Sequence, residues 1–530
     1  MKSHSISRSR PALALLCGLA LVAAACGSDD KTSTTAAPAA TEAPAATEAP
    51  AGTEAPAGTE APAGTEAPAG TEAPAGTDAA SAAGCPAIDA SLDETGGTGA
   101  GRFVSDLTCA GDAPLKAEGD PIVVGFQNPE GDPNGSFPEF SLAAQATADY
   151  INNELGGLGA DIQNGIPGRP IELKVCKMAI TPDDSQRCAN ELLTDEPFMV
   201  FSSINFFGNQ FPIYNASGTP VVVITPITVG DFTSPGVYAI GGGGGCLGVH
   251  TGLIEFATTQ FTPTKIAVPW ADTPPGVVCY YDLEKKPIDV LNGSVAGTGK
   301  RAGSMPDLTS IGVPVKPATP DVTPQVTEVL DFAPDVIVFS AQGSDCWNFV
   351  DGLGRLGWTP DTIPLVLSGA CIDFDAMKAA GDLAKGIYFV GAPGAVLQDP
   401  ATIDDPRDSF EAGIYQTKLI ENGLDPAELN KGFATQAATG LLSLWELSSN
   451  IVAGGGELTS DAIASAYADT AGQHLFGSTP LSCSTAPAPY VAVCNSEVAA
   501  TQWDGTALVP VGGVFTGKDL VAGTEIKPGP

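Results

Sequence analysis

The most reactive side chains of this chain are its cysteines and histidines, and their spacing favours neither catalysis nor metal binding. The sequence holds 12 cysteines and 3 histidines. No two cysteines are spaced Cys-x-x-Cys, and no cysteine and histidine cluster has the spacing of a zinc site. Neither G-x-S-x-G nor H-E-x-x-H occurs, and we expect His250 and His474 to be structural. We therefore predict no metal, no cofactor and no enzyme, although the 61 acidic residues leave a glycoside-cleaving carboxylate pair open.

Cys26 follows a short apolar stretch and indicates export. Residues 1–10 are basic, and the apolar residues 11–25 are too few to span a bilayer, which needs about 20. A basic start, an apolar core and small residues before a cleavage site are typical of an export signal. Because Cys26 directly follows "AAA", the segment resembles a bacterial lipoprotein signal, with Ala23 where that family has leucine. The resemblance implies that Cys26 becomes the first mature residue and carries a diacylglycerol; the alternative is ordinary secretion.

An exported chain meets an oxidising environment, where cysteines pair. Removing Cys17 with the signal and Cys26 with the lipid leaves ten of the 12 cysteines, which suggests five disulfides. Many connectivities are open. The pairing in chain order, which we adopt as a hypothesis, is Cys85–Cys109, Cys176–Cys188, Cys246–Cys279, Cys346–Cys371 and Cys483–Cys494.

The segment after Cys26 is predicted to be a tether. Residues 27–84 repeat "TEAPAG" and contain too few apolar side chains to offset the entropy of ordering. As a flexible coil they would span roughly 40 Å, and as polyproline II up to about 180 Å. The formal net charge of the whole chain is −37, which is the wrong sign for a nucleic-acid-binding protein. We expect a solvated, acidic, extracytoplasmic body.

Downstream of the tether, strand-length apolar runs alternate with helical segments. Near-continuous apolar strands between helices are typical of a parallel sheet covered on both faces. We therefore predict an α/β chain of two doubly wound, Rossmann-like lobes. The strands are expected at "IVVGF", "RPIELKVCKM", "FMVFSS", "TPVVVITP", "KIAVPW", "DVIVFS" and "IPLVLSG". The glycine run 241–245 lies between the lobes and is predicted to be a hinge, or otherwise a loop at the cleft.

Several stretches resemble the type I periplasmic binding proteins, in particular the branched-chain amino acid/amide branch that serves ABC importers. They are "YINNELGG" followed by "GRPIEL", then "TPVVVITPIT", "DVIVFSAQGSDCWNFVDGLGRLGW" and "FATQAATGLLSLWEL". The resemblance covers roughly residues 120–520. It implies two lobes joined by three crossovers, a small ligand in the cleft between them, closure around that ligand, and docking of the closed form on a membrane permease.

The expected site lies beyond the carboxyl ends of the strands, where ligands bind in open α/β sheets. The family's serine for a ligand carboxylate matches Ser202, Ser203 and Asn205, and its small and hydroxyl residues match Thr225 and Thr228. Ala370 stands where the partner of a ligand ammonium is expected, and a buried ammonium without a carboxylate would be costly. We therefore predict a ligand other than a plain α-amino acid. The complete expected set is Asn128, Ser202, Ser203, Asn205, Phe206, Thr225, Thr228, Trp270, Asp272, Gln342 and Ala370, with Phe207 and Trp347 as further aromatic residues near the cleft.

These interpretations give an expected organisation. The signal covers residues 1–25, the anchor and linker 26–84, and a disulfide-closed leader 85–119. Lobe 1 comprises 120–244 and about 390–478, and lobe 2 comprises 245–389 and about 479–530. We predict a monomeric solute-binding protein of an ABC importer, lipid-anchored at the outer face of the cytoplasmic membrane, with a small molecule and a permease as partners and no nucleic acid. A binding lipoprotein that feeds a sensor or an envelope assembly is the alternative.

Overall fold

The computed structural model describes residues 107, 114–133, 135–241, 245–292, 307–391, 395–429, 431–473, 475–486 and 488–521. By its contacts the chain divides into two units, Met1–Gly76 and Thr77–Pro530, and all of the described residues belong to the second. The predictions that concern Cys26, Cys85, Cys109, His474 and Gly242 to Gly244 lie outside them. No helix in the described ranges is long and apolar enough to cross a membrane.

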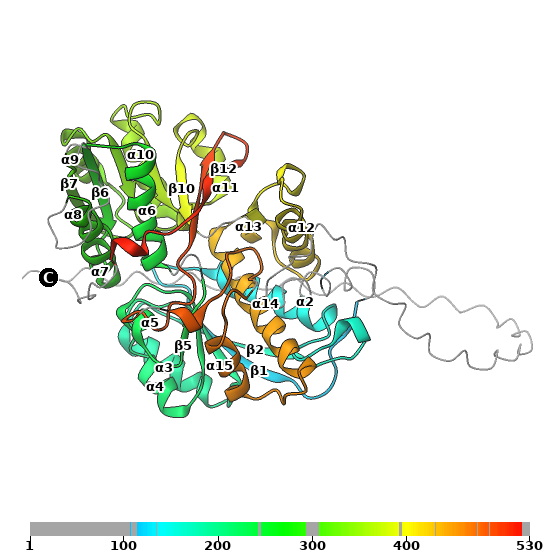
Figure 1. Ribbon diagram of the computed structural model, residues 1–530. Coiled ribbons are helices and arrows are strands. Elements are labelled where there is room, and N and C mark those ends of the chain that lie inside the picture. The colour runs from blue at the N-terminus through cyan, green and yellow to red at the C-terminus, as the bar shows by residue number, and fades with distance from the viewer. Residues whose placement is uncertain are drawn as a thin grey trace, which may run out of the picture. The chain divides into compact units, whose positions relative to one another are not determined.

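The first sheet is parallel and has the strand order β2-β1-β3-β4-β5. Because side chains alternate along a strand, one face of this sheet receives Val124 and Phe126 and the other receives Val200 and Val223. Helices α2 and α14 cover the first face, and α3 and α4 cover the second (Figure 1). The strands are β1 (Ile122–Pro129), β2 (Ile171–Met178), β3 (Met199–Ile204), β4 (Val221–Thr225) and β5 (Val237–Ala239).

The helices around this sheet come from two separate parts of the chain. The early part contributes α2 (Pro138–Asn153), α3 (Pro182–Leu193), α4 (Phe211–Ser217) and α5 (Val229–Thr233). The late part contributes α12 (Pro406–Glu421), α13 (Pro426–Leu429), α14 (Gly432–Ala453) and α15 (Ser460–Ala468). The packing of α14 on α2 joins the two parts: the Trp445 indole donates a hydrogen bond to the Leu155 carbonyl at 3.1 Å, and the rings of Phe140 and Phe433 stack at 4.7 Å.

The second sheet has the order β12-β11-β10-β9-β8-β6-β7, and among these strands only β11 runs antiparallel to its neighbours. Its strands are β6 (Lys265–Ala271), β7 (Thr309–Val315), β8 (Val336–Phe339), β9 (Leu365–Ser368), β10 (Tyr388–Gly391), β11 (Val498–Trp503) and β12 (Leu508–Phe515). Its helices are α6 (Cys246–Gln260), α7 (Pro274–Tyr280), α8 (Lys286–Leu291), α9 (Thr323–Asp331), α10 (Ser344–Arg355) and α11 (Phe374–Ala380). The chain passes between the sheets after β5, after β10 and before β11.

The fold class is as predicted, but individual elements differ from the expected ones. The stretch "CYYDLEKKPIDVLNG" has a helical pattern in the sequence but is not one continuous α-helix; the structure has α7 and α8 joined by the π-helical turn η2 (Tyr281–Lys285). Pro287 accounts for the break because it has no N–H to continue the α-helical pattern. Strands β5 and β7 were not predicted, since β5 has three residues and β7 is a partly exposed edge strand.

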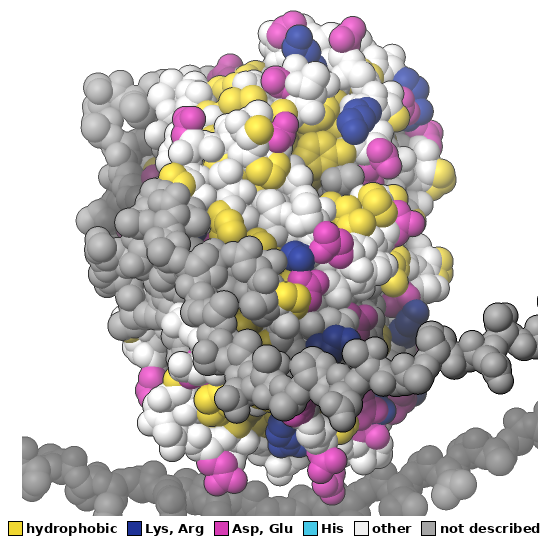
Figure 2. All heavy atoms as spheres, turned by 90° about the vertical axis from the view of Figure 1, so that its right-hand side faces the viewer, with side chains coloured by type: hydrophobic (Ala, Val, Ile, Leu, Met, Phe, Trp, Pro, Cys, Tyr) yellow, Lys and Arg dark blue, Asp and Glu magenta, His cyan; other side chains and the backbone are white. Residues whose placement is uncertain are grey.

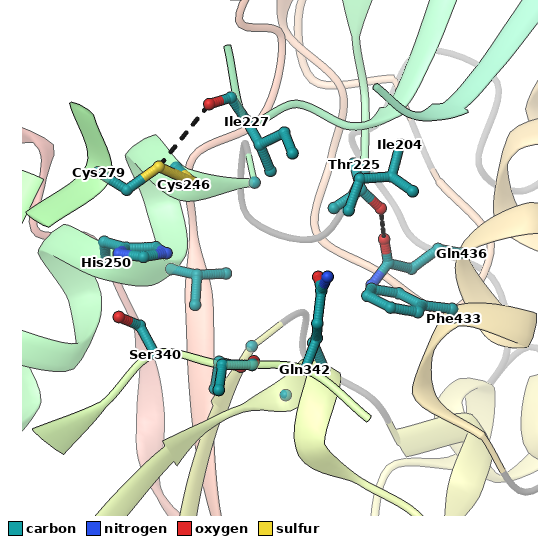
Figure 3. A pocket seen from close by; sticks show the side chains of 18 of the residues that line it. Ile204, Thr225, Ile227, Cys246, His250, Cys279, Ser340, Gln342, Phe433 and Gln436 are labelled. Atoms are coloured by element: carbon teal, nitrogen blue, oxygen red, sulfur yellow. Dashed lines mark hydrogen bonds between the residues drawn. A yellow bond between two sulfur atoms is a disulfide. The ribbon is translucent and has the colours of Figure 1, made fainter. Parts of the chain in front are cut away.

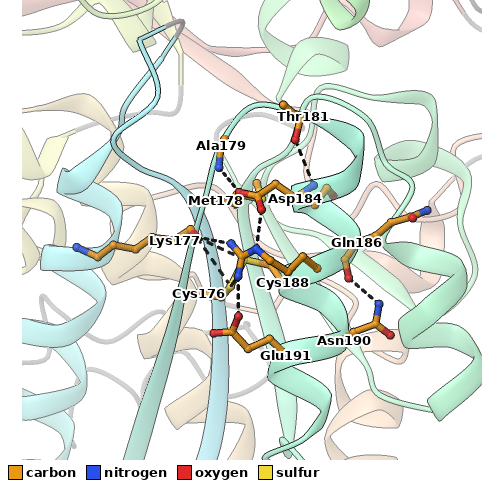
Figure 4. A network of polar contacts seen from close by, with 12 residues as sticks. Cys176, Lys177, Met178, Ala179, Thr181, Asp184, Gln186, Cys188, Asn190 and Glu191 are labelled. Carbon is orange, nitrogen blue, oxygen red and sulfur yellow. Dashed lines mark hydrogen bonds and ion pairs between the residues drawn. A yellow bond between two sulfur atoms is a disulfide. The ribbon is translucent and has the colours of Figure 1, made fainter.

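Four disulfides join described residues, and they are four of the five chain-order pairs: Cys176–Cys188, Cys246–Cys279, Cys346–Cys371 and Cys483–Cys494. The first connects β2 to α3. Arg187 lies beside it, with its guanidinium between Asp184 and Glu191 at 2.5 and 2.6 Å and donating to the Lys177 carbonyl. Figure 4 shows Asp184 and Glu191 beside the disulfide. The guanidinium of Arg187 lowers the pKa of Asp184 below its ordinary value.

Candidate ligand-binding site

A pocket lies where strands of both sheets end. From the first sheet it is lined by Ile204 at the end of β3 and Thr225 at the end of β4. From the second it is lined by Ala271, which ends β6, and Ser368, which ends β9. Figure 3 shows the labelled side chains converging on one space from several elements. The carboxyl ends of parallel strands therefore form the site, as expected for open α/β sheets.

The pocket walls are mainly apolar. Phe206 follows β3, and Phe433 lies in the first turn of α14. Ile227, Val249 and Leu397 add aliphatic surface, and further apolar atoms come from Ile204, Pro275, Pro317 and Ile372. Aromatic and branched walls of this kind suit a ligand with an apolar body, which a few polar groups then orient.

Thr225, Gln436, Ser340 and Gln342 place hydrogen-bonding atoms at this site. The Thr225 hydroxyl donates to Gln436 Oε1 at 2.7 Å, which leaves the amide nitrogen of Gln436 available as a donor. The Ser340 hydroxyl is buried and, among the described residues, has no hydrogen-bond partner. Figure 3 shows the amide of Gln342 pointing into the same space. Buried polar atoms without partners are rare, so Ser340 is a strong candidate for contact with a ligand.

The pocket carries few ionisable groups. Among its described lining residues, Asp345 is the one carboxylate, and no lysine or arginine is present. Desolvation by burial raises the pKa of Asp345, and the hydrogen bond that its carboxylate accepts from the Ala318 N–H opposes this rise. The described lining of the pocket therefore carries few charges, whereas the formal net charge of the whole chain is −37.

The remaining ionisable side chain in the lining is His250, in the second turn of α6. Its Nδ1 lies 2.9 Å from Glu284 Oε1. Cys246, His250 and Cys279 also place their ligand atoms within 4.8 Å of one another. The two sulfur atoms are joined in a disulfide, however, and therefore are not thiolate ligands for a metal.

Four of the expected site residues line the pocket: Phe206, Thr225, Gln342 and Ala370. The residues that sequence reasoning did not select include Ser340, His250, Phe433 and Gln436. Ser340 is the last residue of the predicted strand "DVIVFS" and directly follows β8, so the strand-end rule could have found it. Phe433 and Gln436 lie in α14, and no local pattern in the sequence indicates that this helix reaches the cleft.

Three expected residues bond inside the first sheet's core instead. Asn128 donates to the Phe137 carbonyl and to the Ser141 hydroxyl, and its Oδ1 accepts from Ser203 at 2.6 Å. Asn205 donates to the Ser185 hydroxyl and accepts from the Phe207 N–H. All three side chains are fully buried. Their hydrogen-bonding capacity is used within the protein, so they do not line the pocket.

The other expected residues also lie outside the lining. Ser202 is buried within β3, and Thr228 caps the N-terminus of α5 in a capping box with Asp231. Trp270 stacks on Tyr280 at 5.2 Å, Trp347 donates its indole N–H to the Cys371 carbonyl, and Phe207 packs partly buried against the first sheet's core. Asp272 is partly exposed after β6, where its backbone N–H donates to the Val315 carbonyl. Cap, core and turn roles account for these six residues.

Two glycines allow backbone segments to pack closely together beside the pocket. Gly245, at the N-cap of α6, has a φ of +55°, and a Cβ on it would lie 1.8 Å from the Pro226 carbonyl oxygen. A Cβ on Gly241 would lie 1.5 Å from the Ile224 carbonyl oxygen. Both glycines line the pocket. Close packing against the backbone at the end of β4 therefore explains why glycine occupies positions 241 and 245, the described ends of the run.

Comparisons with known proteins agree with this geometry. The family model for periplasmic binding protein matches residues 121–413, which is more than half of the chain. No curated protein sequence matches significantly. Among solved structures, a branched-chain amino acid ABC transporter protein from Thermus thermophilus with bound valine has a TM-score of 0.58 at 13% identity, covering 77% of this chain and 98% of that one. These similarities concern the fold.

Two further solved structures hold aromatic acids. The solute-binding protein of an ABC transporter from R. palustris, in complex with 4-hydroxybenzoate, has a TM-score of 0.55 at 17% identity and covers 75% of this chain and 97% of its own. The one from Rhodopseudomonas palustris BisB5, in complex with 3,4-dihydroxybenzoic acid, has a TM-score of 0.54 at 17% identity and covers 75% and 98%. The matched region, the two sheets and the site between their strand ends together show that the chain belongs to the family of periplasmic binding proteins, which are extracytoplasmic and bind solutes.

Proposed function

We propose that this chain is the lipid-anchored solute-binding component of an ABC importer. It captures a small organic ligand with an apolar or aromatic body and a carboxylate or amide group, rather than a plain α-amino acid. The family supports the solute-binding role, and the signal-like segment that ends at Cys26 supports the anchor. The ligand is held in the interlobe cleft, and closure of the lobes presents the loaded form to a permease.

The observation that carries the ligand class is the small number of charges in the pocket. An α-amino acid brings an ammonium and a carboxylate, and a buried charge needs a partner. Ala370 lines the pocket without a charge, and Asp345 already accepts a hydrogen bond from the Ala318 N–H. Neutral donors such as Ser340 and Gln436 suit a carboxylate or an amide, and the walls formed by Phe206 and Phe433 suit an apolar body.

The test is thermal unfolding of the purified full chain, with disulfides intact, against aromatic and aliphatic carboxylates, amides, amino acids and sugars. A ligand at about 100 times its dissociation constant raises the free energy of unfolding by roughly 2.7 kcal/mol. We expect stabilisation by a carboxylate or an amide. Stabilisation by a standard amino acid alone would contradict the ligand class, and stabilisation by nothing in the panel would contradict solute capture.

A matched pair of variants locates the binding in the pocket. Thr225→Val removes the hydroxyl that orients Gln436 and is expected to reduce the ligand-induced stabilisation. Thr233→Val is the same change on α5, where the hydroxyl donates only to the Val229 carbonyl, outside the pocket. It is expected to leave the ligand-induced stabilisation intact. Equal effects of the two variants would place the ligand elsewhere.

The importer role is tested by uptake. Cells that lack the chain should lose high-affinity uptake of the stabilising ligand, and expression of the wild-type chain should restore it. Expression of Thr225→Val should restore it only at higher ligand concentration. Normal uptake in cells without the chain would remove the permease from the proposal while leaving ligand capture in place.

A further inference from the structure

Glu284 is fully buried and sits directly behind the pocket. It lies in the π-helical turn η2, and its side chain is 0% exposed. Within the described part of the chain its oxygens have no hydrogen-bond partner, and its single ion-pair contact is with His250 Nδ1 at 2.9 Å. π-Helical turns are rare and frequently occur at functional sites. The turn at Pro287 thus brings an acid against a histidine that lines the pocket.

The burial of this pair restricts where its protons can be. An isolated carboxylate in an apolar interior is costly, so the charge of Glu284 is either balanced by a protonated imidazole or removed by a proton of its own. In the first arrangement both ring nitrogens of His250 carry hydrogen. In the second the Glu284 hydroxyl donates to Nδ1, and the ring proton is then on Nε2. Both arrangements put an N–H donor on Nε2.

That donor faces the ligand site. Because Nδ1 is turned to Glu284, Nε2 is the ring nitrogen left for a ligand, and Figure 3 shows the imidazole extending from α6 toward the pocket. The Ser340 hydroxyl, buried and without a partner among the described residues, lies on the same side of the pocket in that view. Two donors therefore lie on the same side of the pocket.

We propose that His250 is a specificity-determining residue, oriented by the buried Glu284, which binds an oxygen of the ligand through Nε2–H together with Ser340. Ligand binding then requires one proton on the pair formed by His250 and Glu284. This inference rests on the proposed function, because it assigns the chemistry of the same pocket. Loss of one proton from the pair leaves Nδ1–H beside a charged Glu284 and a bare Nε2. An Nε2 without a proton repels an acceptor oxygen. The affinity for a carboxylate therefore falls as pH rises and the pair loses this proton.

Other ionisable groups near α6 are engaged elsewhere. On the elements packed against α6, Asp282 pairs with Lys286 and Lys285 pairs with Asp289. Tyr280 is buried, and burial together with Glu284 raises its pKa. The ring of Tyr281 contacts Trp270 and Tyr280, and the ring of Tyr388 contacts Phe256 and Phe261. Lys518 and Asp519 line a separate cavity. Strands β8, β9 and β11 carry no ionisable side chain. Across the pocket the group to control for is Asp345.

The first readout needs no ligand. Nitrogen-15 NMR of histidine-labelled full chain, assigned by the spectrum of His250→Gln, reports which ring nitrogens carry protons. We expect His250 to show a protonated Nε2 over a range of pH that ends in a transition in which one proton is lost. The Glu284→Gln variant should change the tautomer or shift that transition. A neutral ring protonated only at Nδ1 throughout this range would overturn the inference, whatever the chain binds.

The second readout uses 4-hydroxybenzoate as the probe, with 4-hydroxybenzamide as its uncharged counterpart. For the wild type, the dissociation constant of the acid should rise up to about tenfold per pH unit above the transition seen by NMR. Asp345→Asn and Glu139→Gln should keep this slope. The double variant His250→Phe/Glu284→Gln leaves no unpaired buried carboxylate and should lose both the slope and at least about tenfold in affinity for the acid.

Three results separate this inference from the proposed function. Stabilisation by the acid with the same pH slope in the double variant overturns the role of His250 and leaves solute capture in place. Tighter binding of the amide than of the acid, with no slope, does the same. Failure of both probes to bind overturns the assignment of His250 to an acid ligand, and the wider ligand panel then decides on solute capture separately.

Discussion

Glu139 is a buried acid at a junction between the two sheets' helices. It lies in the first turn of α2, and its electrostatic neighbours are Lys431, Glu428 and Asp373. Asp373 precedes α11, Lys431 precedes α14, and the two form an isolated β-bridge. Desolvation by burial raises the pKa of Glu139 from 4.5 to about 7, and this is opposed by the positive charge of Lys431.

We therefore predict a pH-dependent stability that Glu139→Gln removes. Between 4.5 and about 7 the folded chain holds a proton on Glu139 that the unfolded chain has released. The contribution of Glu139 to the free energy of unfolding is thus complete below this range and declines as pH rises through it, by on the order of 2 kcal/mol. Urea unfolding from about pH 4.5 to 8 should show a flatter profile for Glu139→Gln than for the wild type.

The control for this prediction is Glu118→Gln, because Glu118 is exposed. It should leave the pH profile of stability unchanged. Parallel profiles for the wild type and Glu139→Gln would show that Glu139 does not hold a proton in the folded chain near neutral pH.

At the scale of single residues, the sequence predicted polar types correctly at strand ends but not the direction of each side chain. Asn128 and Ser203 were expected to reach the ligand, yet they bond to each other within the core of the first sheet. Gln342 and Thr225 have the same general chemistry and do line the pocket. The difference depends on which face of the sheet each side chain occupies, and this is set by packing of helices distant in sequence.

The start of α6 is the element on which the pocket most depends. Its first turns carry Cys246, Val249 and His250, and its N-cap Gly245 approaches the end of β4 closely. Gly343 caps α10 with nearly the same backbone, φ +53° against +55°, but a Cβ there would meet nothing within 4 Å. The two glycines thus share a conformation and differ in their surroundings.

The comparison of Gly245 with Gly343 leads to a prediction about stability. Gly343→Ala is expected to cost about 1 kcal/mol of stability through backbone strain alone. Gly245→Ala adds a clash with the Pro226 carbonyl oxygen and is expected to cost on the order of 3 kcal/mol and to weaken ligand binding. Chemical unfolding and ligand titration of both variants measure these effects. Equal losses of stability would mean that the α6 start moves freely, as a flexible hinge would.

At the scale of elements, alternation of apolar runs and helical segments was sufficient to predict two doubly wound lobes. Most predicted strands lie within a few residues of β1 to β4, β6, β8 and β9. Short or edge strands such as β5 and β7 carry too few buried residues to stand out. The break between α7 and α8 follows from Pro287, which the sequence shows, but its consequence for the direction of Glu284 does not.

At the scale of the whole molecule, the visible face has surface charge that is spread rather than concentrated. Figure 2 shows acidic side chains dispersed over one face among hydrophobic and uncharged ones, with basic side chains between them. A mixed surface with a large net negative charge keeps a protein soluble and does not attract nucleic acid.

The proposed anchor is tested on the full chain in its host. Cys26→Ser should release the protein from the membrane fraction into the medium or the soluble envelope fraction, because the acceptor of the lipid is lost. Cys17→Ser is the matched control within the proposed signal and should leave the protein membrane-associated. Cell fractionation and mass spectrometry of the mature N-terminus distinguish these outcomes. A membrane-bound Cys26→Ser protein would exclude lipidation at this position.

The late arrival of α14 has a consequence for how the protein is made. The apolar face of β1, β3 and β4 is only partly covered, by α2, until residues 432–453 pack on that helix, nearly 300 positions later in the chain. A chain that emerges N-terminus first therefore cannot complete its first lobe until most of its length has been delivered. The half-emerged chain therefore exposes apolar surface for longer than a lobe built from one continuous segment would, which makes it prone to aggregation until α14 has packed.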